Sequence, residues 1–125
     1  MKAWIPLTLV FALGSAGYAQ ADCTYPRAPS SIPDGNTASK DEMIAAKNDV
    51  ARYNNEMNAY LDCIKLEIQA ATTKDPSKLS KEDKAKAEEQ EKMLTQKNNA
   101  AVDELQGVVG RFNEQLKLWK AAHAS

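Results

Sequence analysis

The fold is decided by residues 39–71, SKDEMIAAKNDVARYNNEMNAYLDCIKLEIQAA, which have the pattern of one long amphipathic helix. Apolar side chains recur every seven residues from Met43 to Ile64, and others follow at offsets of three or four. At about 100° per residue these positions share one face of a helix, while Lys, Asp and Asn side chains occupy the other faces. No Gly or Pro interrupts the stretch. We therefore expect a helix over about residues 39–73.

Both ends of this helix are marked in the sequence. Ser39 and Glu42 have the spacing of a capping box, in which each side chain accepts a hydrogen bond from the main-chain amide of the other residue. At the far end Asp75 precedes Pro76, and a residue before proline is pushed out of helical geometry. The helix is thus expected to begin after Ser39 and to end before Asp75.

A second helix is predicted over residues 80–122, where Ser80 and Asp83 repeat the cap pattern. Its first half is charged almost all round, with Met93 and Leu94 as the only large apolar residues before residue 97. Its second half carries an apolar stripe. The sequence therefore predicts an all-α, antiparallel two-helix hairpin of coiled-coil type, with this stripe packed beside the start of the first helix. The stripe consists of Ala101, Val102, Leu105, Val108, Val109, Phe112, Leu116 and Trp119.

Residues 1–21 have the features of a signal peptide. Lys2 gives a positive start, residues 3–13 are apolar, and Ala19-Gln20-Ala21 offers a cleavage site. The apolar run is too short to span about 30 Å of hydrocarbon, so we do not expect a stable membrane span after cleavage. Removal of residues 1–21 from the 125 leaves 104 residues, enough for one small domain. We expect a periplasmic or secreted protein, cleaved near Ala21.

The two cysteines, Cys23 and Cys63, remain after cleavage. An even pair in an exported chain predicts one disulfide bond. Metal binding is the alternative, but two thiols and the distant His123 make a poor zinc site. Cys63 lies about 120° from the apolar stripe of its helix, so another segment must cover that flank.

That segment is residues 22–38, a strap with Pro26, Pro29 and Pro33 that favours extended backbone. The first helix rises about 36 Å from Ser39 to Cys63. Sixteen extended residues reach about 50 Å, so the strap can run antiparallel along the helix after a turn at Asp34-Gly35. A disordered Pro-rich tail is the alternative. The remaining chain, residues 39–125, is assigned to the hairpin.

The composition argues against several function classes. The formal net charge is −1, and −2 after loss of Lys2, which gives no general attraction to nucleic acid or anionic lipid. No nucleotide-binding, nucleophile-elbow or zinc-protease motif is present in the sequence. We assign no catalytic, cofactor-binding or metal-binding residue, and we do not expect an enzyme.

Two groups of residues are candidates for a partner surface. Tyr53 and Tyr60, beside several asparagines, form a polar–aromatic cluster, although they could instead pack against the second helix. Gly107 and Gly110 fall on the back of the second helix, where each costs about 1 kcal/mol relative to alanine. They indicate either simple tolerance of glycine, or a smooth face that another chain can approach closely.

Several short motifs resemble a group of small exported proteobacterial proteins. They are Cys23, Ile32-Pro33-Asp34-Gly35, Glu42-Met43, and a helix with Tyr60-Leu61-Asp62-Cys63 preceded by Tyr53. The resemblance covers mainly residues 23–64. It implies export, the disulfide bond and a bacterial envelope location, and it implies no activity.

Together these features predict an exported, non-enzymatic periplasmic protein with an interaction or structural role. Its partner would be another protein or a second copy of the chain. The alternative is a holdase-like chaperone or inhibitor that binds a protein client through the charged tip of the hairpin and its methionine-containing stripe.

Overall fold

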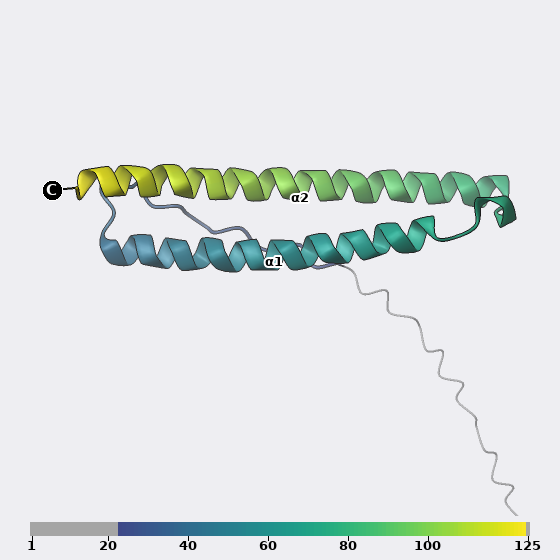
Figure 1. Ribbon diagram of the computed structural model, residues 1–125, viewed down its shortest axis with the longest axis horizontal. Helices are drawn as coiled ribbons and strands as arrows, with labels where there is room; N and C mark the ends of the chain where they lie inside the picture. The colour runs from purple at the N-terminus through teal and green to yellow at the C-terminus, as the bar shows by residue number, and fades with distance from the viewer. Residues whose placement is uncertain (1–22, 125) are drawn as a thin grey trace, which may run out of the picture.

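The computed structural model describes residues 23–124, which form two long antiparallel helices and an extended N-terminal strap (Figure 1). Helix α1 spans Lys40–Thr72 and helix α2 spans Lys81–Ala122. The connection between them contains a short 3-10 helix, η1, over Pro76–Lys78, and the described residues form no strand. The predicted all-α hairpin is therefore confirmed. The predicted signal peptide, residues 1–21, lies outside the described part of the chain.

The helix starts have the predicted caps. Ser39 Oγ accepts from the amide of Glu42 at 3.1 Å, and the amide of Ser39 donates to Glu42 Oε2 at 2.7 Å. Ser80 Oγ accepts from the amide of Asp83 at 3.1 Å. These bonds satisfy main-chain amides that have no partner within the helix, and they fix where α1 and α2 begin.

The core lies between the two helices and extends over only part of their length. The stripe predicted on α1 is buried from Met43 to Ile64, and the α2 residues facing it are buried or partly buried from Leu94 onwards. Before Leu94, α2 buries no side chain. Among the described residues no charged side chain is buried, and the buried side chains are apolar or tyrosine, so apolar packing holds the helices together. The buried residues of this core are Ala38, Met43, Ala46, Val50, Tyr53, Met57, Tyr60, Ile64, Leu94, Ala101, Val108 and Phe112.

The strap differs from its predicted position in one respect. It begins on the flank of α1 at Cys63, as predicted, but its second half lies against α2 (Figure 1). There the amide of Gly35 donates to Gln115 Oε1 at 2.9 Å, and Trp119 Nε1 donates to the carbonyl of Ala38 at 3.1 Å. The physical reason is that the groove between two helices buries more apolar surface than the flank of one, so Ala28, Ile32 and Ala38 all join the core cluster.

Candidate functional site on the strap face

The strap is fixed at its start by the disulfide bond between Cys23 and Cys63, whose Cα atoms are 5.7 Å apart. Cys63 lies on the α1 flank outside the core stripe, where the strap reaches it. The bond closes a loop with a sequence separation of 40 residues. In the chain-entropy model such a crosslink stabilises the folded state by about 4 kcal/mol. The disulfide therefore holds the strap on the hairpin, as the sequence predicts.

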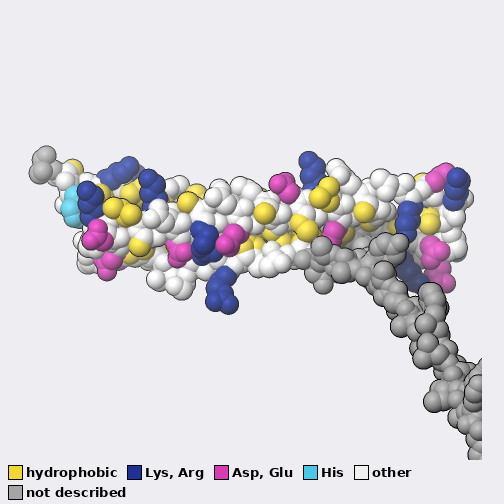
Figure 2. Space-filling view, turned by 90° about the horizontal axis from the view of Figure 1, so that it is seen from below, with side chains coloured by type: hydrophobic (Ala, Val, Ile, Leu, Met, Phe, Trp, Pro, Cys, Tyr) yellow, Lys and Arg dark blue, Asp and Glu magenta, His cyan; other side chains and the backbone are white. Residues whose placement is uncertain are grey.

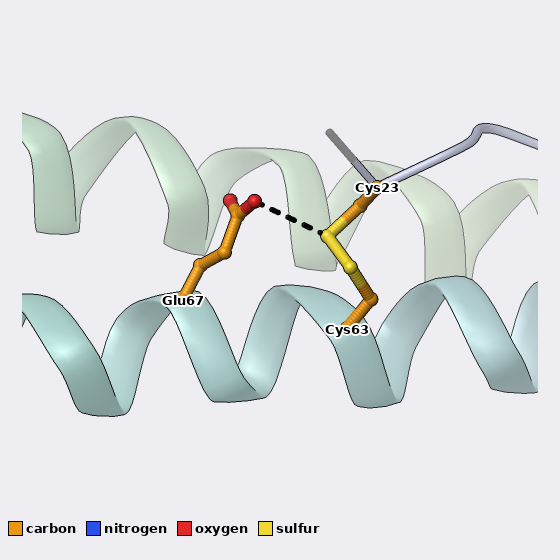
Figure 3. The surroundings of a disulfide bond; sticks show 3 residues. All are labelled: Cys23, Cys63 and Glu67. Carbon is orange, nitrogen blue, oxygen red and sulfur yellow. Dashed lines mark hydrogen bonds between the residues drawn. A yellow bond between two sulfur atoms is a disulfide. The ribbon is translucent and has the colours of Figure 1, made fainter. Parts of the chain in front are cut away.

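A carboxylate that the sequence analysis did not identify lies beside this bond. Glu67 is one helical turn after Cys63, and its Oε1 lies 3.3 Å from Cys23 Sγ (Figure 3). A disulfide sulfur carries no proton to donate, so this is a close approach of a carboxylate to a sulfur rather than an ordinary hydrogen bond. The two sulfurs and the carboxylate lie within 4.8 Å of one another. Sulfurs joined in a disulfide are not the thiolates that a metal requires, so the oxidised site is not a metal site.

Next along the strap, Tyr25 bridges the two helices. Its ring packs edge-to-face on Tyr60 of α1, with centroids 4.9 Å apart and planes at 75°. Its hydroxyl donates to Glu104 Oε2 of α2. Desolvation and the hydrogen-bonded Glu104 carboxylate both raise the pKa of Tyr25, which keeps the hydroxyl protonated as a donor. The predicted strap thus has a polar–aromatic contact with both helices.

The candidate partner residues Tyr53 and Tyr60 are not on the surface. Tyr53 is 0% exposed and Tyr60 is 7% exposed, so both belong to the core. Burial raises the pKa of Tyr53, and the nearby Glu104 carboxylate raises it further. The expectation that they present a recognition surface is corrected: their rings fill the space between the helices and the strap. Tyr25, which the sequence analysis did not select for this role, is the exposed tyrosine here.

An open hollow of about 280 Å³ lies between the start of the strap and α1. Its only carboxylate is Glu56, which is ion-paired with Arg52 at 2.8 Å. The side chains that line the hollow are therefore mainly apolar. It is lined by Thr24, Pro26, Glu56, Ala59, Tyr60 and Cys63.

Gly107 and Gly110, the other predicted candidates, are exposed on α2. A Cβ atom built on either residue would meet nothing within 4 Å. The α2 surface is therefore open at both positions. It is the part of the predicted partner surface that the structure leaves accessible.

The second anchor of the strap is near the C-terminal end of α2. Gly35 packs so closely on α2 that a Cβ there would overlap the carbonyl of Gln115 and lie 2.9 Å from the amide of Trp119. His123 stacks on Trp119 with ring centroids 4.3 Å apart, and it is exposed, as expected of a residue near the C-terminus. The predicted turn at Asp34-Gly35 thus requires glycine because the main chains approach each other.

The outer surface carries both signs of charge. On the face in Figure 2, basic and acidic side chains are interspersed along the molecule, so neither sign forms a continuous patch there. In residues 23–124, neither helix has an apolar run of the length and hydrophobicity that a membrane crossing requires. Comparisons of the chain with models of protein families, with curated proteins and with solved structures find no match.

Proposed function

We propose that this is an exported, non-enzymatic protein of the periplasm or the secreted space that presents helix faces to a protein partner or to a second copy of itself. The observation that carries the proposal is the open surface of α2 at Gly107 and Gly110, on a scaffold fixed by a disulfide bond. A second helix can approach most closely where side chains are absent, because the side chains at the contact set the interaxial distance.

The disulfide supports the export part of the proposal. Such bonds persist in oxidising compartments and are rare where thiol reductants are abundant. The signal-peptide features of residues 1–21 support the same location. An apolar core without buried charged side chains in residues 23–124 supports an interaction role rather than acid–base catalysis.

Site-specific photocrosslinking in cells tests this proposal. A benzophenone amino acid replaces Gly110, and in a matched control it replaces Asn58, which is exposed on α1. We expect one discrete crosslinked species in the envelope fraction from position 110 and none from position 58. Equal, diffuse crosslinking from both positions would contradict a partner surface on α2.

A second candidate function, client binding by a holdase-like chaperone, is favoured by two exposed apolar side chains near the hairpin connection. Leu66 on α1 is 66% exposed and Met93 on α2 is 48% exposed. A holdase binds an unfolded chain through exposed apolar side chains, and neighbouring charged side chains keep the complex from aggregating.

Light scattering of a chemically unfolded enzyme, diluted into buffer with the mature protein, tests this second function. We expect Leu66→Lys with Met93→Lys to abolish any suppression of scattering. Leu118→Lys is the matched control, since Leu118 is an exposed apolar residue in the last turns of α2. No suppression by the unmodified protein in stoichiometric excess would reject the holdase function.

A further inference from the structure

We propose that Glu67 is a guard residue for the Cys23–Cys63 disulfide: its carboxylate lies against Cys23 Sγ, and its negative charge selects against anionic thiols. The structure suggests no other role for this carboxylate. Glu67 forms no ion pair with any residue in the described part of the chain, and its one polar contact there is with the sulfur.

The placement of the carboxylate matters because the attacking group in thiol–disulfide exchange is an anion. An attacking thiolate brings its negative charge to bonding distance of the sulfur that it attacks. Figure 3 shows the Glu67 carboxylate beside the disulfide bond, pointing from α1 towards Cys23 Sγ. Oε1 is 3.3 Å from Cys23 Sγ, and the carboxylate lies within 4.8 Å of both sulfurs. Glu67 therefore places a negative charge close to an anion that attacks Cys23 Sγ and repels it.

The reaction consists of two exchanges. An external thiolate RS⁻ forms a bond to Cys23 Sγ, and the electron pair of the broken disulfide leaves on Cys63 Sγ, which takes a proton from water. A second RS⁻ attacks the mixed disulfide, releases RSSR, and leaves Cys23 as a thiolate. The protein is reduced by two electrons and two external thiols are oxidised. If the attack begins at Cys63 Sγ, the leaving charge develops on Cys23 Sγ, again 3.3 Å from the carboxylate.

If Glu67 acts as a guard, the rate of disulfide reduction depends on the charge of the attacking thiol, whereas a purely structural role predicts no such dependence. Two charges about 4 Å apart in a half-exposed site interact strongly enough to change a rate by about tenfold. The effect is repulsive for a thiolate that carries a second negative charge. For a thiolate with a nearby ammonium group, the attraction of the ammonium to Glu67 offsets the repulsion.

The experiment measures reduction rates of the folded, oxidised mature protein by quenching with an alkylating agent and counting labelled cysteines by mass spectrometry. The thiols are mercaptoethanesulfonate, which is anionic, and cysteamine, which carries an ammonium group; rates are expressed per thiolate. We expect Glu67→Gln to accelerate reduction by mercaptoethanesulfonate about tenfold and reduction by cysteamine less than threefold. The difference should disappear in 1 M salt, where the Debye length is about 3 Å.

Glu114→Gln is the matched control, because it makes the same change in net charge at an exposed site in the second half of α2. It should leave both rates unchanged. If Glu67→Gln accelerates both thiols equally, the residue acts on the fold or on the leaving group and the guard role is rejected. If neither rate changes, the carboxylate does not control access to the sulfur, and the proposal also fails.

Discussion

The two halves of α2 are parts of one helix, but they are stabilised in different ways. Residues 94–122 pack on α1 and on the strap, and contain the buried Leu94, Ala101, Val108 and Phe112. Residues 81–93 bury no side chain and depend on the Ser80 cap and on exposed pairs such as Glu82–Lys86. Residues 94–122 are therefore stabilised mainly by tertiary packing, whereas residues 81–93 are stabilised by local helix-forming interactions.

The largest expected effect comes from removing the tie that holds the strap on the packed half. Replacing both cysteines by serine should lower the free energy of unfolding by about 4 kcal/mol, because the unfolded chain regains the entropy of the closed loop. The melting temperature should fall by about 20 °C, measured by circular dichroism. A chemical reductant should have the same effect on the unmodified protein. An unchanged melting curve in both cases would mean that the strap does not contribute to stability.

Two methionines test the difference in stability between the packed core and the charged first half of α2. Met57 is 0% exposed in the core, and Met57→Ala should cost about 3 kcal/mol through lost burial and the cavity left behind. Met93 is half exposed on the charged half, and Met93→Ala should change stability by less than about 0.5 kcal/mol. Urea unfolding monitored by circular dichroism measures both. Equal losses would show that the charged half is packed after all.

Glycines provide a third comparison, between a crowded and an open position. Gly35→Ala should destabilise the protein by about 2 kcal/mol, because the new Cβ would overlap the α2 main chain at Gln115. Gly107→Ala meets open space in a helix and should stabilise it by about 1 kcal/mol. Thermal melts of the two variants should therefore shift in opposite directions. A stable Gly35→Ala protein would place the second half of the strap away from α2.

The smallest effect is expected on the charged half. Lys86 Nζ lies 3.3 Å from Glu82 Oε1, and both side chains are well exposed. Water and salt screen such a pair, so Lys86→Ala should cost no more than about 0.5 kcal/mol. The loss should shrink further in 1 M salt, which a salt series of urea titrations would detect. A larger loss would show that local electrostatics matter more in this half than we infer.

Most of the fold was predictable because it depends on local patterns. The seven-residue spacing from Met43 to Ile64 determined which face of α1 is buried, and the Ser39 and Ser80 caps set where the helices start. The candidate site was less predictable. Tyr53 and Tyr60 share the spacing of core residues, and only the packed structure decides whether a tyrosine at such a position is covered.

The contacts that the sequence analysis missed join residues far apart in the chain. Tyr25 with Glu104 and Gly35 with Gln115 are separated by 79 and 80 positions. No pattern within either segment marks the partner. The position of Glu67 near the disulfide could have been predicted, because Glu67 follows Cys63 by one helical turn, and this spacing places two side chains on one face.

The amino-acid sequence is enough to predict two helices, their starts and ends, the apolar face of each, and the Cys23–Cys63 pairing, because these follow from periodicity, capping and cysteine count. The packed structure was needed to show that the strap crosses from α1 to α2, that Tyr53 and Tyr60 are enclosed, and that Glu67 lies beside the disulfide. The strap has no regular secondary structure that would fix its direction. Its path is set by the groove that forms once the two helices have packed together.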